Sequence, residues 1–426
     1  MGKHVTPPPQ LPNAAEIDLA RWIRPGDAVL WGQANAEPLT LVRAYADQRQ
    51  RFARTSVFLG IHQSGILRPE HADALDFFSY CGSAANRKLA DADVLDPLPA
   101  HYSTLPTLIR SRRVRVDVLM LQVSSPDAAG RHSLGLACEY LGAALDVARV
   151  VIAEVNDQVP WTHGERWLDA KRIDVAIPAS YPPLVSPPAA IGPVEAAIGR
   201  HVAQLIEDGA TLQCGLGAIP EAVLGALGDR RDLGVHSGTV GDGIAALMQC
   251  GALTNALKGR DSGIGVAGVL MGSAALHRFA HRNPALQLRT TDYTHDPEVL
   301  ASLHRLVAIN SAIEVDLSGQ VNAEVAAGAY VGAVGGAVDF LRGAHRSRGG
   351  VPVVALPSTA GARSRIVAAL SGPVSTPRCD AGVFATEHGI ADLRGLSIAA
   401  RVKRMLDIAH PHHREQLERD AHALSR

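Results

Sequence analysis

The sequence has few cysteines, and they are not arranged for cross-linking or for zinc. Its 426 residues include five cysteines, at positions 81, 138, 214, 250 and 379, and no two of them form a Cys-x-x-Cys pair. An odd, scattered set argues against a disulfide framework and a zinc knuckle. The 18 histidines give no metal signature either, because the dense group His410-Pro-His-His413 has no carboxylate at ligand spacing. We therefore expect a polar loop there and no metal cofactor.

Excess charge of one sign and long apolar runs are also missing. Lys and Arg together number 41 against 42 Asp and Glu, aromatic residues make up 4%, and no basic run is interleaved with aromatics. This balance disfavours nucleic acid as a partner, so a phosphate-bearing ligand must be held by local groups. No apolar run reaches membrane-spanning length, and Pro7–Pro9 stands where a secretory signal would carry its apolar core. We expect a cytoplasmic protein without a membrane partner; assembly into a homo-oligomer stays open.

A strand–loop–helix pattern dominates the middle of the sequence. Ala210–Cys214 predicts a short buried strand, and Pro220 suits the first turn of the helix that follows. The loop between them consists of Gly215, Leu216, Gly217 and Ala218. Such a turn directs backbone N–H groups at a ligand above the sheet, which suits a phosphate, a carboxylate or an oxyanion. Plain packing geometry is the alternative, since similar turns occur in many α/β proteins.

The same pattern comes earlier in the chain. Asp27–Trp31 reads as a strand, Gly32–Pro38 as a loop, and the residues from Leu39 onward as a helix. This repetition favours an internal duplication with one α/β domain per copy, against chance similarity of two turns. Proline pairs between residues 182 and 193 mark a linker, which gives domains 1–190 and 191–426. Further strands are predicted at Thr55–Gly60, Val114–Val123, Val147–Val155, Leu306–Asn310, Ile313–Leu317 and Val351–Leu356.

Taken in order, the motifs of the chain resemble those of the acetyl-CoA hydrolase/transferase family, which includes 4-hydroxybutyrate and acetate/butyrate CoA-transferases. The matching segments are Gly32-Gln…Glu37-Pro38, Val123–Asp127, His132–Gly135, Val151–Asn156, Thr162–Gly164, Gly215–Pro220, Glu314–Asn322, Gly335–Phe340 and Thr386–Gly395. The resemblance implies two similar α/β domains with the active site in the cleft between them. It also implies that acyl-CoA and a small carboxylic acid are the substrates, with CoA carried as a thioester.

The resemblance further implies covalent chemistry. A glutamate of the family attacks the acyl-CoA, passes through a mixed anhydride and holds CoA as a glutamyl thioester until a second acid collects it. CoA contacts are implied for the loop Gly215, Leu216, Gly217 and Ala218, for the glycine pair Gly335 and Gly336, and for Arg342, which suits a phosphate. A flexible surface loop is the alternative for residues 328–343.

The chain departs from the family at the nucleophile. Where the family typically reads Gly-(Ile/Val)-His-(Thr/Ser)-Glu, this sequence reads Gly234-Val-His-Ser-Gly238. Glycine has no side chain, so Gly238 cannot carry an acyl or CoA adduct. Another carboxylate then takes the role, or water attacks the thioester, or the protein binds acyl-CoA without turnover.

The candidates for these alternatives come from both copies. Glu37 is the substitute nucleophile or, alternatively, a carboxylate that stabilises the start of its helix. His62 and His236, interpreted as counterparts at strand ends, are the candidate bases for water. The catalytic candidates are therefore Glu37, His62, His236, Ser237 and Gly238. We favour CoA transfer to a small acid, a dicarboxylate or hydroxy acid among the choices, over thioester hydrolysis and over inactive acyl-CoA binding.

Overall fold

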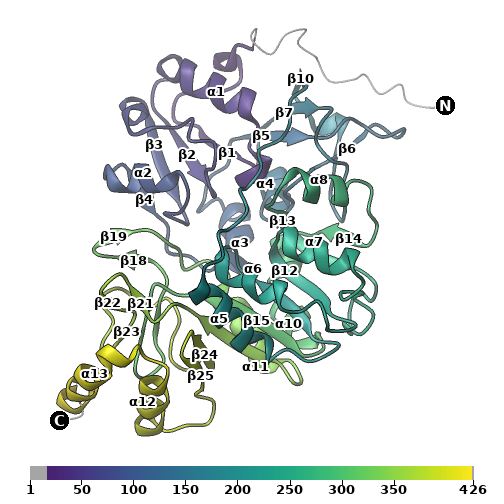
Figure 1. Cartoon of the computed structure of the whole chain (residues 1–426). Helices are drawn as coiled ribbons and strands as arrows, with labels where there is room; N and C mark the ends of the chain where they lie inside the picture. The colour runs from purple at the N-terminus through teal and green to yellow at the C-terminus, as the bar shows by residue number, and fades with distance from the viewer. Residues whose placement is uncertain (1–16, 425–426) are drawn as a thin grey trace. The chain divides into compact units, whose positions relative to one another are not determined.

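The computed structural model describes residues 17–424, which divide into two compact units (Figure 1). Unit 1 contains the described residues up to Pro187 together with Gly268–Tyr293, and unit 2 contains Pro188–Ala267 and the chain from Thr294 onward. The first boundary lies beside the proline-rich linker expected near residue 190. Residues 268–293 differ from the predicted division, because they pack with the first half of the chain. The segment Pro7–Pro9 lies outside the described residues.

Unit 1 is built on a parallel sheet of seven strands in the order β10-β7-β5-β1-β2-β3-β4. The central strands are buried along their whole length, as expected for a parallel sheet covered on both faces. The strands are β1 (Ala28–Trp31), β2 (Thr55–Leu59), β3 (Leu75–Ser79), β4 (Leu95–Pro97), β5 (Val118–Val123), β7 (Val150–Asn156) and β10 (Val175–Ala179). The helices are α1 (Leu39–Gln48), α2 (Asn86–Asp91), α3 (Leu105–Arg110), α4 (Leu141–Val147) and α8 (Ala274–Ala280).

Residues 268–293 join unit 1 through backbone pairing. Strand β14 (Leu286–Leu288) pairs in parallel with β8 (His163–Gly164), and Cys138 N–H donates to the carbonyl of Gly268 at 3.0 Å. A short antiparallel pair, β6 (Arg131–Ser133) with β9 (Trp167–Asp169), completes the strands of this unit. Such non-local pairing leaves no periodicity that a sequence-based division could detect.

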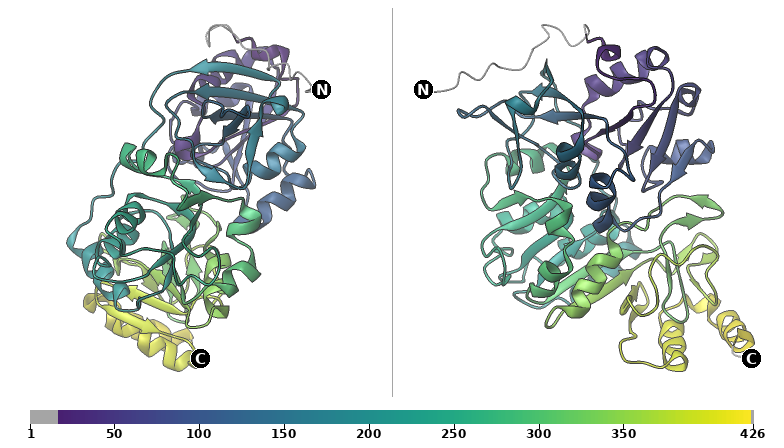
Figure 2. Two further views of the ribbon diagram at one scale, coloured as in Figure 1. Left: turned by 90° about the vertical axis from the view of Figure 1, so that its right-hand side faces the viewer. Right: turned by 180° about the vertical axis from the view of Figure 1, so that it is seen from behind.

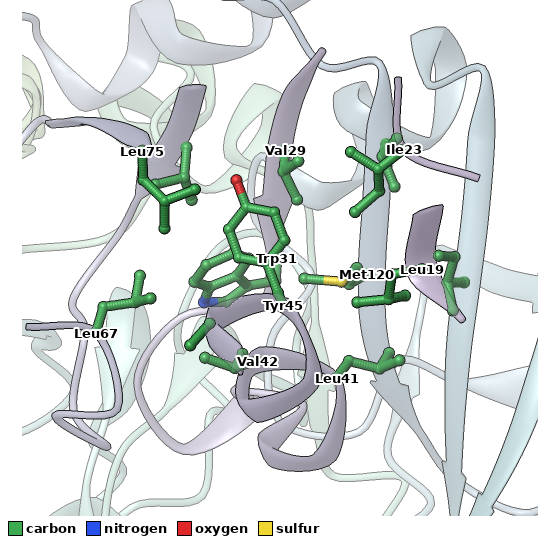
Figure 3. Packing of buried hydrophobic residues seen from close by; sticks show 14 of the residues in the cluster. Leu19, Ile23, Val29, Trp31, Leu41, Val42, Tyr45, Leu67, Leu75 and Met120 are labelled. Atoms are coloured by element: carbon green, nitrogen blue, oxygen red, sulfur yellow. The ribbon is translucent and has the colours of Figure 1, made fainter. Parts of the chain in front are cut away.

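The core of unit 1 lies between α1 and the sheet (Figure 3). Helix α1 buries one face through Leu41, Val42 and Tyr45, which is the 3–4 spacing of an amphipathic helix. The Tyr45 ring meets Trp31 of β1 edge to face, with 5.8 Å between ring centroids. Its hydroxyl pairs with Thr55 Oγ1 at 2.8 Å, so the phenol is buried with its polar atom satisfied.

Unit 2 repeats this architecture with strands in the order β25-β24-β20-β15-β11-β12. The strands are β11 (Thr211–Cys214), β12 (Gly234–Val240), β15 (Leu306–Ser311), β20 (Val351–Ala355), β24 (Val383–Thr386) and the antiparallel β25 (Gly389–Asp392). Its helices include α5 (Pro193–Ala203), α6 (Ala218–Gly225), α7 (Asp242–Gln249), α10 (Pro297–Ser302) and α11 (Ala337–Arg346). Two elements, β13 (Gly265–Leu270) and α9 (Thr291–Thr294), span the points where the chain passes between units.

The strand orders of the two units match. In unit 1, β1 lies between β2 and β5, with β7 and β10 beyond β5; in unit 2, β11 lies between β12 and β15, with β20 and β24 beyond β15. Both first strands lead through a glycine-containing loop into a helix. This repeated order is what an internal duplication predicts, and two α/β units of one topology are the observed fold.

The predicted strand at Ile313–Leu317 is present but stands apart from the main sheet. Strand β16 (Glu314–Asp316) lies in a small three-stranded sheet with β17 (Val321–Asn322) and β23 (Ile366–Val367). Two-stranded hairpins follow nearby: β18 (Val325–Ala326) with β19 (Ala329–Tyr330), and β21 (Thr359–Ala360) with β22 (Arg363–Ser364).

The chain ends in two helices, α12 (Ile398–Asp407) and α13 (Pro411–Leu424), drawn in yellow in Figures 1 and 2. Ser397 caps α12 by accepting a hydrogen bond from the amide of Ala400. Pro411 is the first residue of α13. The predicted polar loop at residues 410–413 is wrong in part, because three of its residues form the first turn of α13. Within residues 17–424, no helix has the length and apolar character needed to cross a membrane.

Candidate active site

The glycine loop of unit 2 follows β11 directly. Gly215 N–H donates to the carbonyl of Ile309 on β15 at 3.0 Å, which fixes the start of the loop. Gly217 stands before α6 with φ +113°, a backbone conformation that side chains rarely adopt. The helix begins at Ala218 rather than Pro220, and Pro220 occupies its first turn, where a missing N–H costs nothing. Leu216 is 42% exposed, so this loop faces solvent.

Strand β12 brings Ser237 and Gly238 beside that loop. It pairs in parallel with β11, and Ser237 Oγ donates to the carbonyl of Cys214 at 3.1 Å. His236, fully buried, lies with Nε2 3.1 Å from the carbonyl oxygen of Thr294. Burial, more than the charge of Glu221, raises the pKa of the Cys214 thiol to about 12. Cys214 therefore stays protonated at neutral pH and is a poor nucleophile.

The space next to Gly238 is filled by a histidine that is not among the predicted site residues. A Cβ at position 238 would lie 3.1 Å from Cε1 and 3.2 Å from Nε2 of His295, and 3.7 Å from Phe340. A Cβ at Gly336 would lie 2.6 Å from the same Nε2. The imidazole therefore fits only because both neighbouring positions are glycines.

The backbone that follows His295 is fixed by a helix cap that the sequence shows. Asp296 caps α10, with Oδ1 accepting from the amides of Glu298 and Val299 at 2.8 Å each, and Pro297 takes the first helical position. An Asp-Pro helix start was visible in the sequence. The direction of the preceding histidine, toward two glycines distant in the chain, was not.

The residues at and near α11 that were expected to contact CoA do not share one environment in the structure. Gly336 precedes α11 and touches His295, so this glycine shares the surroundings of Gly238. Gly335 adopts φ +59° beside it, which favours glycine. Arg342 pairs instead with Asp380 at 2.8 Å and borders a shallow cavity of about 300 Å³. Much of the segment 328–343 is ordered as β19 and α11 rather than as a loop.

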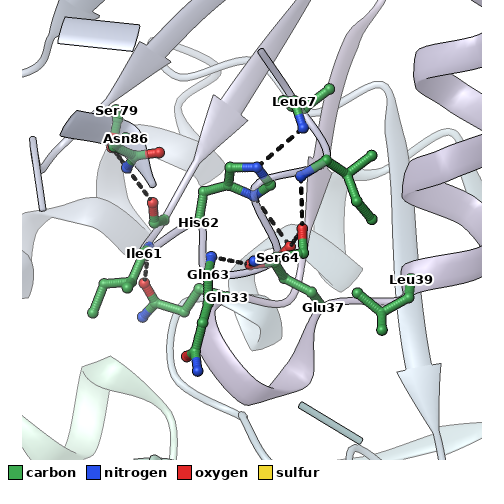
Figure 4. Close-up of polar contacts among 12 residues, drawn as sticks. Gln33, Glu37, Leu39, Ile61, His62, Gln63, Ser64, Leu67, Ser79 and Asn86 are labelled. Carbon is green, nitrogen blue, oxygen red and sulfur yellow. Dashed lines mark hydrogen bonds and ion pairs between the residues drawn. The ribbon is translucent and has the colours of Figure 1, made fainter. Parts of the chain in front are cut away.

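In unit 1, Glu37 ties down the loop that follows β2 (Figure 4). Its fully buried carboxylate accepts hydrogen bonds from Ser64 Oγ at 2.6 Å, from Ser64 N at 3.2 Å and from the amide of Gln63. His62 Nδ1 lies 3.1 Å from the same carboxylate. The amide of Leu67 donates to His62 Nε2 at 3.2 Å, so the proton of a neutral ring sits on Nδ1 and points to Glu37. Both side chains are occupied in holding the loop, which favours a structural role over a nucleophile and a base.

A different carboxylate stabilises the start of α1. Glu154 Oε2 accepts from the amides of Thr40 and Leu41 at 2.9 and 3.2 Å. Glu154 lies on β7, more than a hundred residues along the chain. The helix-start role considered for Glu37 therefore belongs to Glu154.

The strand registers separate His62 from His236. The pairs closest to the two loops are Leu30↔Phe58 in unit 1 and Leu212↔Val235 in unit 2. When the two copies are superposed on these pairs, the counterpart of His236 is Leu59. His62 lies three residues further on, beyond the end of β2. The interpretation of His62 and His236 as counterparts was wrong. The two segments have similar sequences, but their strand registers differ, so the two histidines do not occupy equivalent positions.

A second buried carboxylate in unit 1 stands in a cluster of tyrosines. Gln33 Nε2 donates to Glu139 Oε2 at 2.6 Å, the hydroxyl of Tyr102 donates to the same oxygen, and Tyr80 donates to Gln33 Oε1 at 2.7 Å. Burial raises the pKa of Glu139 to about 7 against the effect of these hydrogen bonds. Its other oxygen, Oε1, has no hydrogen-bond partner among the described residues. Glu139 is therefore poised between its neutral and ionised forms near physiological pH.

Metal ligands are not assembled in the part of the chain that the structure describes. No group of three or more His, Cys, Asp or Glu side chains there is arranged to hold a metal ion.

Comparison with known proteins covers both units. Residues 11–178 match the acetyl-CoA hydrolase/transferase N-terminal domain, and residues 272–421 match the C-terminal domain of that family. The chain is 37% identical to the 4-hydroxybutyrate coenzyme A transferase of Clostridium kluyveri, over 91% of this chain and 92% of that protein. The structure resembles RipA from Yersinia pestis, with a TM-score of 0.90, 32% identity and 96% of each chain covered. It also resembles the 4-hydroxybutyrate CoA-transferase of Porphyromonas gingivalis, with a TM-score of 0.83, 32% identity and 98% of each chain covered.

Proposed function

Because the chain belongs to the acetyl-CoA hydrolase/transferase family, we propose that it moves CoA from an acyl-CoA thioester to a small carboxylic acid. One observation supports this proposal: the glycine loop after β11 lies beside the end of β12, where Ser237 Oγ donates to the carbonyl of Cys214 at 3.1 Å. The loop Gly215–Ala218 and Gly336 are the proposed CoA contacts. All five cysteines are free thiols, which supports a reducing, cytoplasmic setting.

Because position 238 is a glycine, the proposed transfer proceeds without a nucleophilic glutamate at that position. The three atoms nearest to a Cβ at Gly238 belong to His295 and Phe340, and we propose that no carboxylate of the chain replaces the missing glutamate. The acceptor acid is then the carboxylate that attacks. Its oxygen forms a bond to the thioester carbonyl carbon, the carbon–sulfur bond breaks, and CoA leaves as a thiolate beside a mixed anhydride of the two acids.

The second half of the reaction returns the thiolate. The CoA sulfur attacks the acceptor's carbonyl carbon in the anhydride, the anhydride carbon–oxygen bond breaks, and the new thioester and the donor acid are released. Each step passes through a tetrahedral oxyanion, and N–H groups of the glycine loop are the proposed donors to it. Both substrates must be bound together, because no enzyme carboxylate stores the CoA between half-reactions.

Initial-rate kinetics test this proposal directly. We expect intersecting double-reciprocal plots when acyl-CoA and acceptor acid are varied, with no thiol released from acyl-CoA alone. Borohydride added during turnover, followed by peptide mass analysis, is expected to find no reduced carboxylate. Parallel plots with a modified glutamate would establish a substitute nucleophile instead.

Two further outcomes would overturn transfer itself. Thiol release without any acceptor acid would make the protein a thioester hydrolase. Tight CoA binding without turnover, over a panel of monocarboxylic, dicarboxylic and hydroxy acids, would make it a binding protein.

A further inference from the structure

The side chain of His295 takes up the volume that a residue with a side chain at 238 would need. The ring is 4% exposed and lies against Phe340, with 4.6 Å between ring centroids. Its Nε2 edge lies between Gly238 and Gly336, the two glycines on either side. A group that reacts where the missing side chain would point therefore meets an imidazole nitrogen.

The state of the ring follows from its surroundings. Burial lowers the pKa of His295 to about 3, so the imidazole is neutral at physiological pH and carries one proton. Thr294 Oγ1 lies 2.8 Å from Nδ1. When this hydroxyl donates to Nδ1, the single ring proton sits on Nε2 and points toward the two glycines.

We propose that His295 is a catalytic residue of this site, and that its Nε2–H donates a hydrogen bond to the carbonyl oxygen of the bound acyl-CoA thioester. This inference rests on the CoA transfer proposed above. As the acceptor acid attacks, negative charge grows on that oxygen, and the hydrogen bond strengthens. A neutral imidazole can do this without taking up or losing a proton, which is the use of histidine as an electrophile.

The surroundings favour a donor over the two other uses of histidine. A general base or a nucleophile would become positively charged during the reaction, and burial beside Phe340 opposes that charge. A donor stays neutral throughout. Thr294 then acts as a positioning residue, because its hydroxyl selects the tautomer with the proton on Nε2.

Three variants separate a donor from a spacer and from a base. H295Q keeps an N–H donor near the position of Nε2, H295L keeps volume without a donor, and H71Q changes another buried histidine, in unit 1, that is also 4% exposed. We expect H295L to lose about 100- to 1,000-fold in kcat/KM, as for removal of one oxyanion donor. H295Q should lose about tenfold or less, and H71Q should match the wild type. The dissociation constant of free CoA, measured by calorimetry, should stay within about threefold in all of them.

Two results would overturn the inference while the proposed function stands. Full activity of H295L would make the ring a spacer, and an H295Q variant as inactive as H295L would make it a base or nucleophile. Wild-type turnover is measured first, and its absence with every acid would remove the proposed function and this inference together.

A second pair of variants keeps the test available if H295L fails to fold. The methyl group of G238A would press on the imidazole at 3.1 Å and displace it. We expect G238A to lower kcat by about tenfold, and we expect this loss to be much smaller when G238A is combined with H295Q. Equal losses in both backgrounds would contradict a coupling through His295.

Discussion

Replacing Glu139 by glutamine should change how the stability of unit 1 depends on pH. Glu139 is fully buried, and burial raises its pKa to about 7 from the ordinary value of 4.5. Below pH 4.5 the carboxyl is neutral in both the folded and the unfolded protein. Between pH 4.5 and 7 the unfolded chain releases this proton while the folded protein keeps it, so the free energy of unfolding falls as pH rises. Above pH 7 both forms are ionised and the loss is complete.

The expected magnitude follows from the size of this shift. A difference of about 2.5 pKa units, at 1.36 kcal/mol each, gives a loss of about 3 kcal/mol, of which about 2.5 kcal/mol falls between pH 5 and pH 8. The variant E139Q cannot ionise at this position, so this part of the pH dependence should vanish. Its amide oxygen can still accept the hydrogen bonds that Gln33 and Tyr102 now donate.

Urea unfolding at pH 5 and pH 8 measures the effect. The quantity to compare is the change in unfolding free energy between the two pH values, wild type against E139Q, because contributions of other titrating groups then cancel. E70Q, at a surface carboxylate of the same unit, is the matched control and should behave as the wild type. Identical pH dependence in wild type and E139Q would refute the reasoning, since Glu139 would then ionise equally in both states.

Two further changes test the loops. G217A should destabilise by about 1–3 kcal/mol in thermal or urea unfolding, because its φ of +113° disfavours a side chain although no atom lies within 4 Å of the added methyl. G225A, at the end of α6 and equally free of contacts, should be neutral or slightly stabilising; equal losses in both would contradict a conformational cause. E37Q should weaken the hydrogen bonds to the loop after β2 by about 1–3 kcal/mol, seen as faster hydrogen exchange of the Gln63 and Ser64 amides. Unchanged exchange there, with the rest of unit 1 as internal reference, would show that Glu37 does not hold this loop.

Much of the architecture could be predicted because it depends on local sequence patterns. Buried parallel strands are continuous apolar runs, which is why β1, β2, β5 and β11 stand close to where the sequence places them. The linker near residue 190 has a proline signature of its own. The repeated strand–loop–helix pattern also pointed correctly to two units of one topology.

The contents of the site could not be predicted in the same way, because they depend on contacts between distant segments. His295 meets Gly238 and Gly336 only after three separate segments have folded together. The carboxylate at the start of α1 comes from Glu154 on another strand, so nearness in sequence wrongly suggested Glu37. The predicted equivalence of His62 and His236 was wrong because sequence similarity alone does not reveal strand register.

The assignment of Gly268–Tyr293 to unit 1 has a consequence for how the protein is made. The chain leaves unit 1 after Pro187 and returns to it 80 residues later, so neither half is a continuous stretch of the gene. A ribosome must release residue 293 before the first unit has all its parts, by which time much of the second has already emerged. Cutting the gene at the linker would therefore give two incomplete polypeptides, and the cut product ending near residue 190 would lack the strand that pairs with β8.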